Sequence, residues 1–444
     1  MTPQNLNNVI FSVIKESLSA AKKEFYHRAI WDEAKKRAIE SEVYVRVAHV
    51  EVYEGFIIFC DLGRAGFVKI TPKSIKIVDS CPVAFLRPPS MQNLPIPVWD
   101  KKMRPRDAIK GLWELVNIEP KDRRLVIAWL MAVFQQEGTR VALLLEGVQG
   151  SAKTTTLKTL VRIFDPHNPQ APALHRQEKD LYIYARNRLI AAFDNVSDMK
   201  PATSDTLCQI LSGGATSSRK LYSDGDEYVI SAKALVAING ITTGVVRGDL
   251  LDRTLKLELR ELVKGTRKTE KALNDLFVQR HPEILGALLR VAQHGLQNPA
   301  EPPESLDTGR LVDFAHWSFS WAPGLEWEPK KLVSSICENQ QASREEVMNT
   351  DDVVAFIRDL LEQHWGTWKG RATDIHTEFG EWAKDRKFRL SATFPASAQA
   401  MSGWLRRAQP LLPAVGITCI LKQSNNKYPI VLKQAPQGDK KSTE

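Results

Sequence analysis

The sequence predicts an α/β fold, and three observations lead to this prediction. Residues 141–145 form an aliphatic run of the kind that makes a buried strand, and a turn of small residues follows it. Lys153 and Thr154 then begin a segment with the apolar spacing of a helix. Two later aliphatic runs, 189–193 and 235–238, also have the pattern of buried strands.

The segment between the first strand and its helix has the composition of a phosphate-binding loop. Glycines let backbone N–H groups turn toward phosphate oxygens, and the helix N-terminus adds unpaired N–H groups and a positive dipole end. Lys153 is placed to reach the β- and γ-phosphates of ATP, and the Thr154 hydroxyl to ligate Mg²⁺. The expected cofactors are therefore ATP and Mg²⁺. The residues expected to bind the nucleotide are Gly147, Val148, Gln149, Gly150, Ser151, Ala152, Lys153, Thr154 and Thr155.

One position departs from the usual Gly-x-x-x-x-Gly-Lys-Ser/Thr pattern, because Ala152 stands where the second glycine is expected. We expect φ to be negative at a helix start, so that a single methyl group is tolerated there. Gly150 still supplies a flexible residue in the turn. The alternative is a chance glycine-rich turn before a helix, and the register of strand, Lys-Thr pair and helix argues against it.

The strand over 189–193 ends at Asp194, where a P-loop ATPase places the carboxylate that holds Mg²⁺ through water. The next residue is Asn195, whereas many such ATPases have a glutamate that activates the attacking water. An asparagine can orient a water but cannot take its proton, and Asp198 is the candidate substitute. The alternative is an ordinary strand end with an asparagine turn.

Two more residues complete the predicted catalytic group. Asn239 ends the third strand and is expected beside the γ-phosphate, although strands often end in Asn-Gly turns. Arg253 is the first choice for an arginine that reaches a neighbouring subunit's γ-phosphate, and Arg247 is the second. The alternative is a surface arginine paired with Asp249 or Asp252. The predicted catalytic residues are Lys153, Asp194, Asn195, Asn239 and Arg253.

A basic hairpin is expected between the second and third strands. Asp224-Gly225 is a strong hairpin turn signal, and Arg219 and Lys220 enter that hairpin. Facing the pore of a ring, these two cations could hold a nucleic-acid backbone, with Tyr222 as a stacking surface. The alternative is an exposed hairpin without function.

Composition and charge limit the classes of protein to which the chain can belong. The 444 residues are 43% hydrophobic, yet no run of about 18 apolar residues or signal peptide is found, so no membrane segment is expected. Five scattered cysteines fit neither a zinc site nor a disulfide framework and suit the cytoplasm. The net charge is +9, and residues 366–444 hold thirteen Lys or Arg against six Asp or Glu. This excess is typical of a phosphate-binding appendage, although a solvated basic surface would look the same.

The expected organisation is a helical plus β-rich domain over 1–97, an ATPase domain with helical flanks over 98–300, a helical connector over 301–349, a winged-helix-like unit over 350–434 and a disordered tail over 435–444. Within it, helices are expected over 1–40, 104–137 and 268–298, and strands over 41–90. The last unit has three predicted helices (352–363, 372–385, 397–409) and then two strands (417–422, 428–433), which is the order of a winged helix. Its expected DNA contacts are Arg406, Arg407, Lys422 and Lys427.

Five segments, taken in their order along the chain, resemble superfamily III helicases. They are the loop, the strand ending at Asp194, the Gly213-Gly214 segment with Arg219, the strand ending at Asn239 and the segment ending in Arg253. The likeness is greatest to the helicase half of phage and plasmid primase-helicases and to ATP-binding proteins of prophages and integrative elements. It covers 141–262 specifically and the flanks more loosely.

This resemblance implies an AAA+-like core, a homo-hexameric ring and an ATP-dependent DNA helicase or translocase that acts in replication of a mobile element. Single-stranded DNA would lie in the pore and duplex DNA at the winged helix. It gives Lys153 and Thr154 the nucleotide role, Asp194 the metal role, Asn239 the sensor role and Arg253 the finger role. A primase would have to act in trans.

Two other functions remain open from the sequence. The first is a DNA-bound ATPase switch, such as an initiator, helicase loader or defence regulator, which binds ATP without unwinding, and Asn195 favours it. The second is a P-loop kinase acting on a small molecule. The basic C-terminal unit and Arg253 argue against the kinase.

Overall fold

The computed structural model describes most of the chain after residue 42. The described residues are 43–52, 55–99, 102–219, 227–240, 248–263, 265, 267–306, 308–385, 395–422 and 429–434. The helix expected over 1–40 and the tail expected over 435–444 lie outside them, as do Lys220, Arg247 and Lys427.

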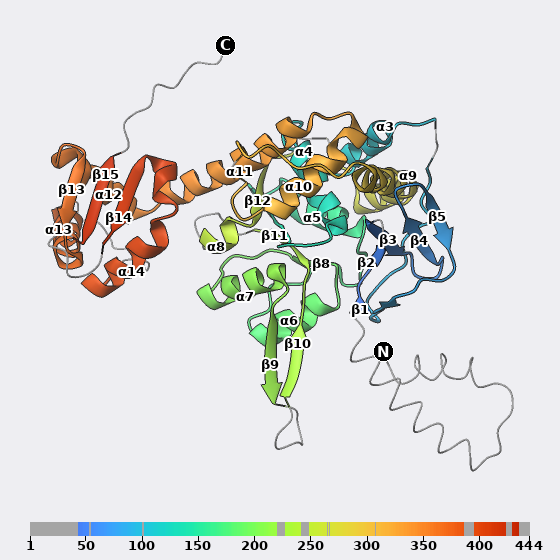
Figure 1. Ribbon diagram of the computed structural model, residues 1–444, viewed down its shortest axis with the longest axis horizontal. Coiled ribbons are helices and arrows are strands. Elements are labelled where there is room, and N and C mark those ends of the chain that lie inside the picture. Colours follow the sequence, from blue (N-terminus) through green and yellow to red (C-terminus); the bar gives the residue numbers. More distant parts are fainter. Residues whose placement is uncertain are drawn as a thin grey trace.

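A four-stranded parallel sheet lies at the centre of the molecule (Figure 1). In spatial order its strands are β12 (Thr254–Leu259), β7 (Ala142–Gly147), β11 (Leu235–Asn239) and β8 (Ile190–Phe193). Alternate residues of β7 face two different cores, because Leu143 and Leu145 belong to one hydrophobic cluster and Ala142 and Leu144 to another. Burial on both faces explains why β7, β8 and β11 contain apolar runs in the sequence.

The helices that connect these strands are α5 (Lys153–Arg162), α6 (Glu178–Arg186), α7 (Pro201–Ser212) and α8 (Gly248–Leu251). The fold is therefore mixed α/β with a parallel sheet, as predicted. Because the strands are parallel, their carboxyl ends meet at one edge of the sheet, and β7 leads there into the predicted phosphate-binding loop.

The β-rich unit near the N-terminus is an antiparallel sheet with the strand order β2-β3-β4-β5. Its strands are β2 (Val47–Val52), β3 (Gly55–Asp61), β4 (Phe67–Ile70) and β5 (Ile75–Val78), beside a short parallel pair of β1 (Val43–Tyr44) and β6 (Ala84–Phe85). The alternation of apolar residues thus predicted these strands correctly. Ile58 and Val68 of this unit belong to the same hydrophobic cluster as the helices that flank the parallel sheet.

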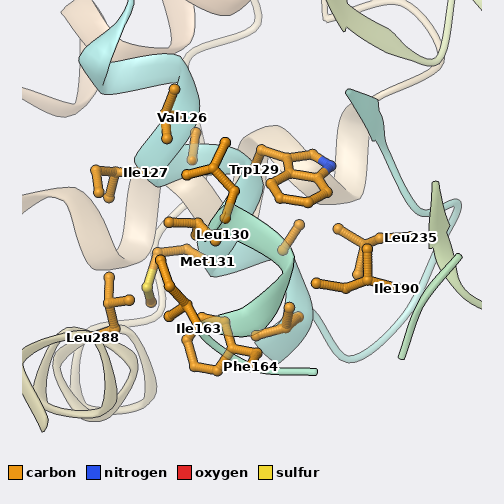
Figure 2. Packing of buried hydrophobic residues seen from close by; sticks show 14 of the residues in the cluster. Val126, Ile127, Trp129, Leu130, Met131, Ile163, Phe164, Ile190, Leu235 and Leu288 are labelled. Carbon is orange, nitrogen blue, oxygen red and sulfur yellow. The ribbon is translucent and has the colours of Figure 1, made fainter. Parts of the chain in front are cut away.

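A helical layer surrounds that common core. Its elements are α3 (Pro105–Ile109), η1 (Lys110–Glu114), α4 (Arg123–Met131), η2 (Ala132–Phe134), α9 (Glu270–Gln297), α10 (Val312–Trp321), η4 (Ala322–Leu325) and α11 (Pro329–Asn349). Figure 2 shows Leu130 and Met131 of α4 beside Ile163 and Phe164, which follow α5, with Leu288 of α9 to one side and Trp129 on the side of Leu235 of β11. The seven buried residues of α4, Leu125–Met131, therefore join the loop-bearing helix to the rest of the molecule.

The helical segment expected over 104–137 is confirmed in part, because α3, η1, α4 and η2 lie in it but residues 115–122 are not helical. Pro120 lies in this break, and proline removes a backbone donor and disfavours helical geometry in the residue before it. The segment 268–298, in contrast, is one long helix, α9.

Helix α11 covers the open edge of β12. The Asn339 side chain acts like a neighbouring strand, because its Oδ1 accepts from the Lys256 backbone N (2.9 Å) and its Nδ2 donates to the Lys256 O (2.7 Å). The Lys256 ammonium also lies 2.9 Å from Glu146 and contacts Glu346 of α11. Although burial alone would lower it, the pKa of Lys256 is raised by hydrogen bonds to Glu346 and Glu146. Helix α11 is thus tied to the strand that bears the loop.

The C-terminal unit has a hydrophobic core of its own. Its elements are α12 (Asp352–Gln363), β13 (Thr367–Gly370), α13 (Ala372–Asp385), α14 (Ala398–Ala408), η5 (Leu412–Val415), β14 (Ile417–Leu421) and β15 (Ile430–Gln434). The strands form an antiparallel sheet of order β13-β15-β14. The three predicted helices and two predicted strands are confirmed, and β13 is an additional short strand.

Candidate functional site

The loop over 147–152 joins β7 to α5 through three residues with positive φ. The angle is +140° at Gly147, +91° at Gly150 and +62° at Ala152. The expectation of a negative φ at Ala152 is therefore wrong. This residue is the N-cap of α5 in the left-handed conformation, because the loop must reverse before the helix begins, and the usual glycine would adopt that conformation without strain.

Lys153 is the first residue of α5, and its side chain turns back over the loop. Its Nζ donates to the Gly147 O (2.5 Å) and to the Val148 O (2.9 Å). Both acceptors are neutral carbonyl groups, which are weaker partners for an ammonium group than phosphate oxygens are. The ammonium group is therefore already at the place where phosphate charge would have to be neutralised.

Thr154 and Asp194 meet across the sheet edge, as their predicted common role requires. The Thr154 Oγ1 donates to the Asp194 Oδ1 at 2.8 Å, and the Asp194 Oδ2 lies 3.7 Å from the Lys158 ammonium. Thr154 comes from the helix after β7 and Asp194 from the end of β8, with β11 between the two strands. This arrangement brings a hydroxyl and a carboxylate oxygen together, and both are ligand types that Mg²⁺ prefers.

Asn239 ends β11, the strand between β7 and β8, and its side chain is buried. Its Oδ1 accepts from the Asn195 backbone N at 2.6 Å, whereas its Nδ2 has no hydrogen-bond partner among the described residues. The buried Ser151 Oγ in the loop is unpartnered in the same sense. Buried polar atoms without partners are uncommon, so these two need a partner that the described residues do not supply.

Asn195 is exposed and adopts a left-handed conformation, with φ +54°. Asparagine tolerates that conformation better than glutamate does, which gives a backbone reason for the absence of glutamate here. Asp198 is also exposed, four residues after Asp194.

Arg253 lies at the opposite end of the sheet from the loop. It precedes β12, whose first residue pairs with Ala142 and whose last residue pairs with Gly147. Six strand residues span about 20 Å, so the Arg253 side chain cannot reach the loop of its own chain. Its Nη1 donates to the Asp249 O (2.8 Å) and Oδ2 (2.7 Å), and its side chain is only 13% exposed. Arg253 is thus paired with Asp249, which is the alternative that the sequence left open.

The predicted hairpin is formed by β9 (Ala215–Arg219) and β10 (Glu227–Ser231), which pair antiparallel. Figure 1 shows it extending away from the parallel sheet, next to α6 and α7. Arg219 ends β9, its side chain is outside the described residues, and Lys220 and Tyr222 are outside altogether.

The predicted DNA contacts of the C-terminal unit lie at two places. Arg406 and Arg407 are exposed in the last turn of α14, and Lys422 is exposed directly after β14. Lys427 comes between β14 and β15 in the sequence and is outside the described residues.

Sequence reasoning missed Asn117, which holds the loop in place. Its Nδ2 donates to the Ser151 O (2.9 Å) and to the Arg260 O (2.7 Å), and its backbone N donates to the Thr156 Oγ1 (3.4 Å). The side-chain amide of Asn117 thus joins the loop to the end of β12, and its backbone N adds a contact with α5. Asn117 belongs to no motif, so the sequence carries no signal for this role.

Among the described residues, no group of three or more His, Cys, Asp or Glu side chains could hold a metal ion, and no helix is long and apolar enough to cross a membrane. A metal at the sheet edge would be held by Thr154 and, through water, by Asp194, with phosphate and water oxygens completing the coordination. The left-handed loop, the Lys153 ammonium and the two buried unpartnered atoms fit a nucleoside triphosphate with Mg²⁺.

Fold and site together define a class: a mixed α/β protein that gathers a lysine, a threonine, an aspartate and an asparagine at the carboxyl edge of a parallel sheet. The family described as "Actinomycete integrative conjugative element replication protein" matches residues 109–324, and "AICE RepA C-terminal domain" matches residues 353–442. Over these two regions the chain is similar to a replication protein of integrative elements, which agrees with the resemblance expected from the motifs. No curated protein matches the chain.

Similar solved structures include an apo form of the NrS-1 C-terminal region, at 17% identity over 77% of this chain and 77% of that chain, with a TM-score of 0.34. Another apo structure of the same region has 15% identity over 88% of this chain and 96% of that chain, with a TM-score of 0.36. A JCV helicase has 15% identity over 53% of this chain and 64% of that chain, with a TM-score of 0.27. Similarities at these TM-scores assign no function to the chain.

Proposed function

We propose that this protein is an ATP-dependent DNA helicase or translocase that acts in the replication of an integrative element. The observation that carries the proposal is the meeting of the Thr154 hydroxyl and the Asp194 carboxylate at 2.8 Å, beside a left-handed loop covered by Lys153. The similarity to element replication proteins over 109–324 and 353–442 supports the biological setting. The loop is then a P-loop in an AAA+-like core.

Each residue of the site has a defined part in this proposal. Lys153 exchanges its two carbonyl acceptors for the β- and γ-phosphate oxygens, and the loop N–H groups bind the phosphates from the other side. Thr154 and Asp194 would hold Mg²⁺, which supplies charge neutralisation at the phosphates. The free Nδ2 of Asn239 donates to the attacking water and orients it.

DNA contact is proposed at two places. The C-terminal unit would act as a winged helix and bind duplex DNA through Arg406, Arg407 and Lys422, with Lys427 in the wing. The β9–β10 hairpin would bring Arg219 and Lys220 to single-stranded DNA in the pore of a homo-hexamer, and a primase would act in trans. The expected cytoplasmic location stays a prediction.

A ring would also explain the position of Arg253. Since it cannot reach its own loop, a catalytic role requires the loop of a neighbouring subunit, as for an arginine finger. Mixing Arg253→Ala with Lys153→Ala protein tests this, because a mixed ring contains some sites with an intact loop and an intact arginine. Partial recovery of hydrolysis supports sites that are shared between subunits. If hydrolysis does not recover, Arg253 has no role beyond its pairing with Asp249.

The main test measures ATP hydrolysis with and without single-stranded DNA, together with strand displacement and native mass. We expect DNA to stimulate hydrolysis, and Lys153→Ala to abolish it. Lys179→Ala, which removes an exposed lysine of α6 away from the loop, is the matched control and should keep the wild-type rate. If Lys153→Ala hydrolyses ATP normally, the loop is not the nucleotide site.

A DNA-bound ATPase switch remains the second candidate, because Asn195 supplies no base for the attacking water. It predicts tight ATP binding, slow hydrolysis and no strand displacement. The helicase predicts displacement that depends on hydrolysis, so the same assay distinguishes the two functions.

A further inference from the structure

We propose that Arg267 is a second phosphate-binding cation of this nucleotide site, an inference that rests on the proposed function of the loop. Arg267 belongs to the connection between β12 and α9, beyond the core strands and outside every motif considered above. It is therefore separated from the loop by more than 100 residues of sequence and reaches the loop only through the fold.

The Arg267 guanidinium group lies directly against the outer turn of the loop. Its Nη2 is 3.4 Å from the Gly150 O, and a Cβ placed on Gly150 would lie 3.1 Å from the same nitrogen. Gly150 also has a φ of +91°. A glycine at this position thus satisfies the backbone of the loop and leaves room for the arginine.

The residues that follow Arg267 fix the direction from which it approaches. The Lys268 Nζ donates to the Glu114 O at 2.9 Å, and the Thr269 Oγ1 caps α9 by accepting from the Ala272 N at 3.2 Å. The backbone beside Arg267 is therefore anchored to the helical layer. Because α9 begins here, a phosphate held by Arg267 would connect the nucleotide to the start of that helix.

Arg267 and Lys153 share one feature that indicates their common ligand. Each cation donates to carbonyl oxygens of the same loop, Arg267 to Gly150 and Lys153 to Gly147 and Val148. A guanidinium group has five donors in a planar fork that matches phosphate oxygens, and the hydrogen bond to Gly150 is long. A triphosphate at the loop would offer charged acceptors to both side chains, which are stronger than the carbonyl groups they use now.

The test is the affinity of the full chain for ATP, ADP and AMP, measured by displacement of a fluorescent ATP analogue. Arg267→Ala should weaken ATP binding about tenfold or more, as expected for loss of a hydrogen bond between charged groups, and AMP binding much less. Arg267→Lys should recover part of the loss, because it keeps the charge but not the fork. Lys271→Ala removes an exposed cation four residues along, on α9, and should bind ATP like the wild type.

The outcomes separate this inference from the proposed function. If wild-type protein binds ATP and Lys153→Ala does not, but Arg267→Ala binds ATP as tightly as wild type, Arg267 is only a surface arginine and the P-loop assignment stands. If wild-type protein binds no nucleotide, the proposed function and this inference both fail. If Arg267→Ala weakens the binding of ATP and of AMP equally, Arg267 does not contact the β- or γ-phosphate. Thermal unfolding of Arg267→Ala and Arg267→Lys checks that both variants are folded.

Discussion

Replacing Asp165 should destabilise the protein strongly, because this carboxylate joins the β-rich unit to the parallel sheet. Asp165 and Arg46 are both fully buried, with 3.7 Å between the Asp165 Oδ1 and the Arg46 Nε. The Asp165 Oδ2 accepts from the backbone N of Leu189 (2.8 Å) and Ile190 (3.0 Å), at the start of β8. The His167 Nε2 lies 3.0 Å from the Oδ1.

The magnitude follows from the groups that Asp165→Ala would leave behind. An uncompensated buried arginine costs about 3–5 kcal/mol. Each of the two backbone N–H groups that loses its acceptor adds about 1–3 kcal/mol. The total is at least about 5 kcal/mol, which is comparable with the whole stability of many domains. Asp165→Asn keeps an oxygen for the two N–H groups and should lose mainly the attraction to Arg46, about 3 kcal/mol.

The same carboxylate gives a pH dependence with a definite sign. Burial alone would raise the pKa of Asp165, but the hydrogen bond and charge of His167, the charge of Arg46 and the Ile190 N–H hold it below the ordinary value of 3.8. A lowered folded-state pKa means that the stabilisation is present above about pH 4 and is lost as the pH falls further toward the folded-state pKa.

Urea denaturation followed by circular dichroism, at pH 7 and at decreasing pH, measures both effects. We expect the unfolding midpoint to decrease in the order wild type, Asp165→Asn, Asp165→Ala, and the acid-induced loss to be smaller in Asp165→Asn. Asp180→Ala, an exposed aspartate of α6, is the control. A midpoint for Asp165→Ala equal to that of wild type would refute the reasoning.

Three further predictions concern the loop, the metal site and the C-terminal unit. Ala152→Gly relieves about 1 kcal/mol of left-handed strain, which a similar entropy gain of the unfolded chain offsets, so the free energy of unfolding should change by less than about 1 kcal/mol and the affinity for ATP should not fall. Ala152→Val places a β-branched residue at φ +62° and should weaken ATP binding at least tenfold. Equal binding of ATP by the two variants would contradict the left-handed geometry of residue 152. Thr154→Val should raise the Mg²⁺ concentration that gives half-maximal hydrolysis, with ATP affinity in EDTA unchanged; an unaltered Mg²⁺ requirement would remove Thr154 from the metal site. Arg406→Ala with Arg407→Ala should make the slope of log K against log salt for duplex DNA less negative by about 1.8, since each phosphate contact contributes about −0.9, and an unchanged slope would mean that these arginines are only solvated.

The sequence predicted most where local pattern and burial agree. The first four residues of β7, all of β8 and the first four residues of β11 are apolar because both faces are covered, so a short aliphatic run was enough to identify these strands. Helices α12 and α13 were predicted at the observed bounds, since each is strongly amphipathic and Asp351 caps the first of them. Strand β13 was missed because four residues carry too little periodicity.

What the sequence by itself determined is the order of elements and the chemical types at the strand ends, including Lys153, Thr154 and Asp194. The tertiary structure alone decided how these ends meet: the left-handed Ala152, the opposite-edge position of Arg253, and the contacts of Asn117 and Arg267 with the loop. The physical reason is that these features depend on closing the chain between segments up to 117 residues apart, and hydrophobic spacing reports only on neighbours within a few turns or strand residues.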